Sequence, residues 1–291
     1  MVNSYKARNL PAPTGRDLFY DMVSVYGHQK SEKVRKKIYR LLRLMRRSKK
    51  IEFDDITDNS HTEIIADGYA GPLDFFGMVE REARAYQLGL SVNQPCVVEV
   101  LCEGQGKVVQ LFQLARHYGV PVRSPGGWDS IAPKRELALR AARVWEQTGR
   151  QTRVLHLGDF DPDGVGLFEV LREDSHAFLE AHILDDPKDV LKFKRIMTHR
   201  GQIPQGREAT FDRYEVKEKD HRGKRWPYEF TAQLESVPLE ETLAIVRAEI
   251  EELLDLDQLR EDREQSEVQR DEVLDLTLPL IEDAAERLGD R

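Results

Sequence analysis

Two apolar runs that end in acidic residues constrain the fold of this chain more than any other feature. The first is Val97-Val98-Glu99-Val100-Leu101-Cys102-Glu103, and the second is Val154-Leu155-His156-Leu157-Gly158-Asp159-Phe160-Asp161. Aliphatic, partly β-branched runs of this length are typical of buried strands. We therefore expect two strands whose ends deliver Glu103, Asp159 and Asp161 to the edge of a sheet.

The segments between the two runs indicate that the sheet is parallel. Helical periodicity covers residues 108–118 and 133–146, and a short apolar strand, residues 120–122, lies between them. Alternating strands and helices are typical of α/β folds, whose ligands gather at the carboxyl ends of the strands. The sequence thus predicts an α/β protein with three acids at one edge of a parallel sheet.

Three carboxylates without a His or Cys partner favour a hard cation. Mg²⁺ is the usual ion at such sites, with Mn²⁺ as a substitute, and its shell is completed by water and phosphate oxygens. The acidic edge is therefore typical of phosphate chemistry. One alternative is a calcium loop, which fits Asp159, Asp161, Asp163 and Gly164 but lacks an acid at the twelfth position. Another is an Asp-rich turn in which Asp163 caps the following helix.

Length and composition bound the class of protein. The 291 residues are enough for two domains, and 40% of them are hydrophobic. No apolar run is long enough to span a bilayer, and the first residues lack the apolar core of a signal peptide. Cys96 and Cys102 have no metal-ligand spacing. We expect a cytoplasmic protein, nucleoid-associated if cellular, with no membrane partner.

Charge is strongly segregated along the chain, so the net charge of −8 is not informative about partners. Residues 30–50 hold eleven basic residues and one acid, whereas residues 235–291 hold nineteen acids and six basic residues. The basic stretch has helical periodicity, with an apolar stripe at Val34, Ile38, Leu41, Leu42 and Met45. Its cations are predicted to contact DNA phosphates: Lys33, Lys36, Lys37, Arg40, Arg43 and Arg47.

The neighbours of the basic helix suggest a DNA-binding domain. A shorter helix over residues 15–26, capped by Thr14, precedes it, and residues 51–56 are expected to form a short strand or wing. Two helices followed by a wing are typical of a winged helix-turn-helix domain. The alternative is a solvated cationic helix in an ordinary bundle. At the other end, the acidic and amphipathic residues after Pro238 are predicted to form a packing or dimer helix.

The order of the acids resembles a known domain. Glu103 at one strand end and Gly158-Asp159-Phe160-Asp161-Pro162-Asp163-Gly164 at a later one are similar to the Toprim domain, most closely to that of the A subunit of topoisomerase VI and its meiotic break-forming relatives. The resemblance implies metal binding by Glu103, Asp159 and Asp161. That family commonly has Lys directly after the Glu. This chain has Gly104 there, with Lys107 as a candidate substitute.

A second motif extends the resemblance. Arg16-Asp17-Leu18-Phe19-Tyr20 is similar to the signature around the DNA-cleaving tyrosine of that family, with Tyr20 on the tyrosine and Arg16 on the active-site arginine. The implied activity is a Mg²⁺-dependent cleavage of double-stranded DNA, in which Tyr20, Arg16 and Glu103 are catalytic and a 5′-phosphotyrosyl link forms. The alternative for Tyr20 is a core aromatic residue.

The resemblance also implies partners and domain bounds. In that family the tyrosine of one subunit works with the metal site of another, so we expect a homodimer. The chain has no GxxxxGK[ST] loop, which leaves open a separate ATPase subunit or a stand-alone enzyme of the Mini-A type. The expected order is a winged-helix domain (1–68), a connecting helix (69–94), a Toprim core (95–200) and a helical extension (201–291). Two alternative functions remain, a Toprim nuclease that uses metal-activated water and a non-catalytic DNA-binding protein.

Overall fold

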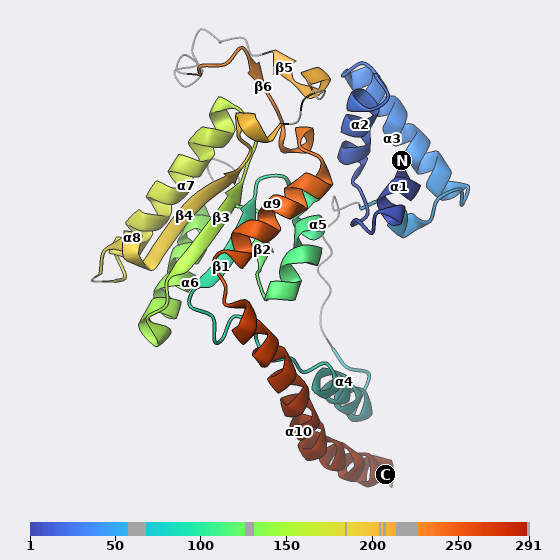
Figure 1. The fold of residues 1–291 in the computed structure, drawn as a ribbon. Coiled ribbons are helices and arrows are strands. Elements are labelled where there is room, and N and C mark those ends of the chain that lie inside the picture. The colour runs from blue at the N-terminus through green and yellow to red at the C-terminus, as the bar shows by residue number, and fades with distance from the viewer. Residues whose placement is uncertain are drawn as a thin grey trace. The chain divides into compact units, whose positions relative to one another are not determined.

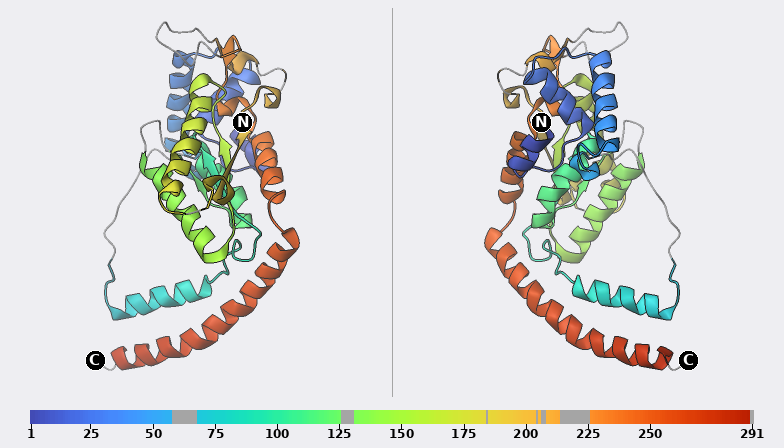
Figure 2. Two further views of the ribbon diagram at one scale, coloured as in Figure 1. Left: turned by 90° about the vertical axis from the view of Figure 1, so that its left-hand side faces the viewer. Right: turned by 90° about the vertical axis from the view of Figure 1, so that its right-hand side faces the viewer.

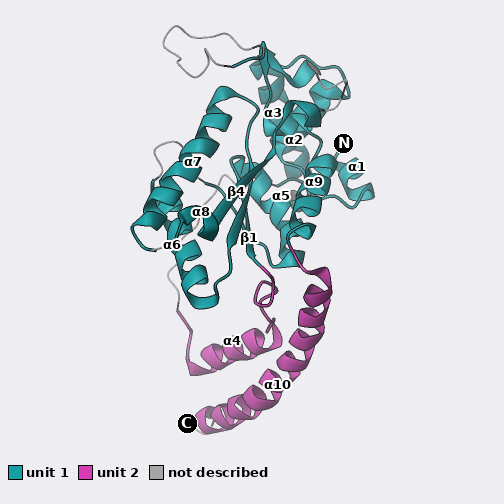
Figure 3. Ribbon diagram, turned by 60° about the vertical axis from the view of Figure 1, so that its left-hand side comes forward, with its two compact units in different colours: residues 1–60, 96–253 teal, residues 61–95, 254–291 magenta. Residues whose placement is uncertain are grey.

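The computed structural model describes residues 1–57, 68–125, 131–183, 185–203, 205, 208–213 and 226–289. The chain forms two compact units, Met1–Ser60 with Cys96–Leu253 and His61–Pro95 with Leu254–Arg291 (Figure 3). Unit 1 therefore contains the N-terminal helices, both acidic strand ends and the segment before the long C-terminal helix. The two units are described separately below.

The centre of unit 1 is a four-stranded parallel sheet, which confirms the predicted α/β class (Figure 1). Its strands have the order β2-β1-β3-β4. They are β1 (Val97–Cys102), β2 (Val122–Arg123), β3 (Thr152–Leu157) and β4 (Leu191–Met197). The chain passes from β1 outward to β2 and then returns to the other side of β1 to form β3. The direction of winding thus reverses between β1 and β3, which is where ligands of open α/β sheets bind.

Helices cover both faces of this sheet (Figure 1). Helices α6 (Ile131–Thr148) and α7 (Pro162–Glu180) pack together on one face, and α5 (Gln105–Ala115) and α9 (Leu239–Glu251) pack on the other. The predicted helices at 108–118 and 133–146 correspond to α5 and α6. Shorter elements connect these parts: η2 (Arg116–Tyr118), α8 (Pro187–Val190), η3 (Arg200–Gln202), η4 (Glu208–Thr210), β5 (Asp212–Arg213), β6 (Phe230–Thr231) and η6 (Leu234–Ser236).

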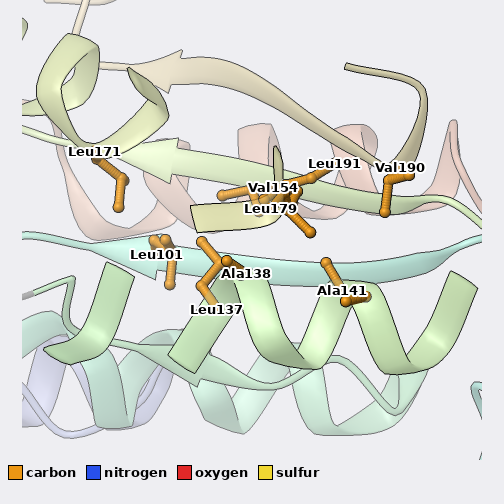
Figure 4. Close-up of a cluster of buried hydrophobic side chains, with 10 residues drawn as sticks. Leu101, Leu137, Ala138, Ala141, Val154, Leu171, Leu179, Val190 and Leu191 are labelled. Carbon is orange, nitrogen blue, oxygen red and sulfur yellow. The ribbon is translucent and has the colours of Figure 1, made fainter. Parts of the chain in front are cut away.

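The core between α6, α7 and the sheet consists of closely packed aliphatic side chains (Figure 4). Leu137, Ala138 and Ala141 of α6 face the strands, and all three are buried. The two alanines at helical spacing let the backbone of α6 approach the sheet closely, because a small side chain leaves no bulk between the layers. This packing fixes β1 and β3, and with them the strand ends that carry the acids.

The N-terminal part of unit 1 consists of α1 (Val2–Ala7), α2 (Gly15–Ser24), α3 (Glu32–Arg47) and η1 (Phe53–Asp55). Thr14 caps α2 as predicted, since its Oγ1 accepts a hydrogen bond from the backbone N–H of Asp17 at 3.1 Å. Two expectations are wrong. Residues 51–56, expected to form a short strand or wing, form no strand and include the single turn η1. Leu41 of the predicted apolar stripe is 48% exposed because the buried face of α3 is narrower, centred on Ile38.

Unit 2 consists of α4 (Pro72–Arg84) and the long helix α10 (Leu256–Gly289), which lie alongside each other (Figure 2). Polar contacts join α10 to the chain that follows α4. The hydroxyl of Tyr86 donates to Gln269 at 2.9 Å, and the backbone N–H of Leu88 donates to Ser266 at 2.9 Å. The acidic tail predicted to be helical is therefore α9 in unit 1 and α10 in unit 2. Among the described residues, no helix has the length and apolar character needed to cross a membrane.

Candidate functional site

The acidic residues lie at the carboxyl edge of the sheet, on the two sides of the point where the winding reverses. Strands β1 and β3 are hydrogen-bonded neighbours, with Cys102 opposite Leu157. Glu103 follows the first strand directly, and its backbone N–H donates to the carbonyl of Leu157 at 3.0 Å. Asp159 follows the second strand after one glycine. The prediction that Glu103 and Asp159 follow two strands at the same edge of the sheet is confirmed, because β1 and β3 are parallel neighbours.

Asp161, and not Asp163, caps the helix that follows the acidic loop. It is the N-cap of α7, and its Oδ1 accepts a hydrogen bond from the backbone N–H of Gly164 at 2.6 Å. The expectation that Asp163 caps this helix is wrong, because Pro162 fits the first helical position and moves the helix start two residues earlier. One oxygen of Asp161 is thereby committed to the backbone.

Arg195 of β4 lies among the three acids, and no sequence motif predicts this position. Its guanidinium donates from Nη2 to the carbonyl of Asp159 at 2.6 Å and from Nη1 to the carbonyl of Gly164 at 2.9 Å. A Cβ at Gly158 would lie 2.7 Å from Cδ of Glu103 and 2.9 Å from Nη1 of Arg195. Glycine at this position thus leaves room for the Glu103 carboxylate and the guanidinium to lie beside each other.

Burial changes the protonation of the groups at this edge. It raises the pKa of Glu103 to about 7, against the opposing effect of Arg195, and it raises the pKa of Asp159 to about 7. His156 lies behind them, fully buried, with its Nε2 3.2 Å from Oε1 of Glu103. Burial lowers the pKa of His156 to about 3, so the ring is neutral at physiological pH. Both carboxyl groups are therefore only partly ionised near neutral pH.

The donor chemistry of this edge suits a hard divalent cation. Oε1 of Glu103 is buried and makes no hydrogen bond. The carboxylate of Asp159 accepts from the backbone N–H of Leu234, and that of Asp161 accepts from the backbone N–H groups of Gly164 and Asp163. Among the described residues, no three His, Cys, Asp or Glu side chains are already arranged as a set of metal ligands. The residues fit Mg²⁺ because their ligand atoms are carboxylate oxygens, and because a bound cation would favour the ionised form of these buried carboxyl groups.

Tyr20 lies in the interior of unit 1, only 2% exposed, packed with Phe19, Val23 and Ile38. Its hydroxyl donates a hydrogen bond to Oε1 of Gln233. Burial raises the pKa of Tyr20 well above the usual value of a phenol, and Arg16 offsets this only in part. In this arrangement the hydroxyl is protonated and covered.

A short segment, Gln233-Leu234-Glu235, connects the tyrosine to the acidic edge. Oε1 of Gln233 accepts a hydrogen bond from the hydroxyl of Tyr20. The backbone N–H of Leu234 donates a hydrogen bond to Oδ1 of Asp159 at 2.8 Å. Glu235 forms an ion pair with Arg16, with 3.2 Å between Oε1 and Nε. The segment is held in place by paired backbone hydrogen bonds between Phe160 and Ala232, at 2.7 and 3.0 Å. We refer to residues 233–235 as the bridging segment.

Asp17 and Lys107 form a buried ion pair that joins α2 to α5. Nζ of Lys107 donates to Oδ1 of Asp17 at 2.7 Å, and the side chain of Gln110 donates to Oδ2 of Asp17 at 3.0 Å. Burial opposes both charges, but their attraction prevails: the pKa of Asp17 is lowered and that of Lys107 is raised. The ammonium of Lys107 is thus committed to Asp17, which argues against its acting as the substitute for the family lysine.

Two cavities border these residues. The larger, about 1050 Å³, lies between α3 and the end of β1, and among its lining residues are Lys36, Arg40, Arg43, Arg47 and Glu103. The smaller, about 220 Å³, is lined by Tyr20, Lys30 and Asp212, among others. Arg16 lines both cavities, whereas Tyr20 lines only the smaller one and Glu103 only the larger one. Lys33 and Lys37 are exposed on α3 and line neither cavity.

Comparison of the chain with family models, with curated proteins and with solved structures found no match.

Proposed function

We propose that this protein is a Mg²⁺-dependent DNA-cleaving transesterase of the type IIB topoisomerase A-subunit type, with Tyr20 as nucleophile. The observation that carries the proposal is the bridging segment. Within one unit it contacts Tyr20, Arg16 and Asp159, which are the three positions where the resemblance places the tyrosine, the arginine and a metal ligand. Arg16 and Tyr20 lie one helical turn apart on α2, whereas Asp159 is remote in the sequence, so the bridging segment joins α2 to the acidic loop after β3.

In the proposed reaction, the phenol oxygen of Tyr20 attacks a phosphorus atom of the DNA backbone. The bond to the 3′ oxygen breaks, a 3′-hydroxyl leaves with a proton, and the 5′ phosphate stays on the tyrosine. The phenol must first leave Gln233 and lose its proton, because burial favours its protonated form. Arg16 lines both cavities, so its guanidinium can stabilise negative charge on the attacked phosphate.

Glu103, Asp159 and Asp161 would hold the metal ion. When bound, Mg²⁺ supplies positive charge that neutralises the phosphate oxygens as the leaving group departs. Arg195 lies beside these acids and holds the backbone of the acidic loop through the carbonyls of Asp159 and Gly164. It therefore positions the loop without using the carboxylates that the metal requires.

The separation of the two cavities favours a homodimer in this proposal. Tyr20 and Glu103 do not line a common cavity within one chain. A phosphate that reaches Glu103 through the larger cavity would not meet the hydroxyl of the same chain's Tyr20. A tyrosine supplied by a second copy removes this difficulty, as the resemblance to the topoisomerase VI family implies.

A second candidate is a Toprim nuclease that uses a metal-activated water, and the burial of Tyr20 favours it. A nucleophile that is 2% exposed cannot reach DNA without movement of the bridging segment, whereas water needs no such movement. The two functions share the acidic edge and differ in whether protein becomes attached to DNA.

Supercoiled plasmid distinguishes these functions. The full chain is incubated with plasmid and Mg²⁺, quenched with detergent, and analysed with and without protease. The transesterase produces cut DNA whose mobility is normal only after protease treatment, and Asp159→Asn produces none. Cut DNA that is free of protein would replace the proposal with the nuclease, and uncut DNA would refute both.

A further inference from the structure

The larger cavity contains an aromatic ring that the proposed reaction does not use. Tyr39 of α3 lines this cavity and is 43% exposed. Lys36 and Arg43 lie on the same face of α3 as Tyr39, three residues before it and four after it, and both line the cavity together with Arg40. An exposed aromatic residue among cations is the combination that binds nucleic acid by base stacking and phosphate contact.

The ring of Tyr39 has a defined position because of Gly15. A Cβ at Gly15 would lie 2.9 Å from Cε1 and 3.4 Å from Cδ1 of Tyr39, so the ring lies directly against the backbone at the start of α2. One side of the ring is supported in this way, while nearly half of the side chain's surface remains open to solvent. A supported ring with an open side is a preorganised stacking surface, since little rotamer freedom remains to be lost on binding.

The charges around the ring fit a polyanion. Of the described residues that line the cavity, six are cationic and two are acidic, and one of the two acids, Glu235, is paired with Arg16. No ion pair involves Arg40 or Arg43 among the described residues. Burial raises the pKa of Tyr39, so its phenol is neutral and contributes a ring rather than a charge.

We propose that Tyr39 stacks on an unpaired base of the bound DNA, while Lys36, Arg40 and Arg43 hold the adjoining phosphates. The proposal rests on the proposed function in that DNA is the partner, and it narrows the substrate class to DNA with an unpaired or extruded base. The size of the cavity supports this choice. At about 1050 Å³ it is comparable to the sites of small ligands, and a paired duplex has no free base face to present to the ring.

The test measures binding without cleavage, so that it does not depend on the proposed chemistry. The full chain in EDTA is titrated with two short duplexes, one fully paired and one with a single bulged 2-aminopurine, whose fluorescence falls when it stacks. Wild-type protein and Tyr39→Phe should quench the bulged probe and prefer it to the paired duplex. Tyr39→Leu should abolish quenching and reduce affinity for the bulged probe about 10-fold, the usual size of one base–aromatic stack.

Tyr26 provides the matched control. It is also an exposed tyrosine, 58% exposed, and it does not line the cavity. Tyr26→Leu should behave as wild type in every assay. The salt dependence of binding should be the same for Tyr39→Leu and wild type, because the number of phosphate contacts does not change.

Three results would overturn the inference. The first is equal affinity of the wild-type protein for the two duplexes, and the second is quenching that persists in Tyr39→Leu. The third is loss of protein-linked DNA in Tyr39→Phe together with its retention in Tyr20→Phe. That result would identify the Tyr39 hydroxyl as the nucleophile. Stacking without any protein-linked DNA in Mg²⁺ would instead support the inference and refute only the transesterase.

Discussion

Asp161 combines two roles, because one oxygen caps α7 while its charge belongs to the acidic edge. Asn is as good an N-cap as Asp, so Asp161→Asn removes the charge and keeps the cap. Likewise, Asp159→Asn keeps an oxygen for the N–H of Leu234. These two substitutions therefore test the metal site without damaging the fold.

We predict that Asp159→Asn and Asp161→Asn each weaken Mg²⁺ and Mn²⁺ binding by more than the roughly 10- to 100-fold typical of outer-shell changes. Titration calorimetry on the full chain measures this directly. Asp163→Asn is the control, because Asp163 is neither the cap nor a proposed ligand, and it should bind metal nearly as wild type does. Wild-type affinity in an Asp159→Asn/Asp161→Asn double variant would exclude this metal site.

The Asp17–Lys107 pair permits a stability prediction. Lys107→Met leaves a buried carboxylate without its partner, and we expect a loss of about 3–5 kcal/mol in the free energy of unfolding at neutral pH. The lowered pKa of Asp17 means that the pair's stabilisation is present above about pH 4 and is lost as the pH falls through the folded-state value. In the variant, acid instead neutralises the unpaired Asp17, so the deficit should shrink as the pH falls from 7.

Urea unfolding at a series of pH values measures both effects. The matched control is Asp17→Asn/Lys107→Met, which removes both charges and keeps the side-chain oxygen at position 17. This double variant should recover part of the lost stability and show a deficit that stays constant between pH 7 and about pH 4. A Lys107→Met deficit that is the same at pH 7 and pH 4 would show that the pair contributes no net electrostatic stabilisation.

At the scale of elements, α3 carries cations in two environments. Lys36, Arg40, Arg43 and Arg47 line the larger cavity, whereas Lys33 and Lys37 are exposed and do not. The contribution of the cavity-lining cations to DNA binding can therefore be compared with that of Lys33 and Lys37 on the same helix.

Replacement of Lys36, Arg40 and Arg43 by Ala should weaken DNA binding and reduce the slope of log affinity against log salt by about one unit for each lost phosphate contact. The Lys33→Ala/Lys37→Ala variant should change the slope less, because these two side chains lie outside the cavity. Fluorescence anisotropy at several salt concentrations gives both slopes. Equal slopes for wild type and the triple variant would show that this face of α3 does not contact DNA.

Local patterns in the sequence were sufficient for the sheet and for the position of its acidic edge. β-branched runs predict strands, and strand direction then places Glu103 and Asp159 together. Finer predictions were wrong where two signals competed. Pro162 moved the cap from Asp163 to Asp161, and the turn η1 at residues 53–55 replaced the predicted strand at 51–56. Tyr39 could have been noticed, since it is an aromatic residue within a basic helix.

Contacts between remote segments could not be predicted from this sequence. Gln233 meets Tyr20 across 213 positions, and Lys107 meets Asp17 across 90. Arg195 is one of several basic residues in β4, and only its place in the sheet distinguishes it from Lys192 and Lys194. Hydrophobic periodicity and motif spacing do not predict such contacts, because the contacts depend on how helices and strands pack after they have formed.

For the whole molecule, the proposal requires that the tyrosine of one copy acts with the acids of another. A mixture of Tyr20→Phe and Asp159→Asn chains then contains dimers with one intact site, made of Tyr20 from one chain and the acids from its partner. We predict that each variant alone is inactive and that the co-refolded mixture nicks single strands of supercoiled plasmid.

The control mixture pairs Tyr20→Phe with a Tyr20→Phe/Asp159→Asn chain, in which no complete site can form by either route. It should remain inactive. If the first mixture is equally inactive although mixed dimers are present, then Tyr20 and Asp159 act within one chain, as their shared contact with the bridging segment would allow.

The central claim is that the hydroxyl of Tyr20 becomes covalently bound to DNA. The most direct measurement is to trap protein-linked DNA in Mg²⁺, digest the DNA and the protein, and identify the modified peptide by mass spectrometry, with Tyr20→Phe treated in parallel. The account predicts a phosphodiester-linked nucleotide on the peptide that contains Tyr20, and no linked DNA in Tyr20→Phe. Cleavage by Tyr20→Phe at the wild-type rate, or a nucleotide on any other residue, would contradict it.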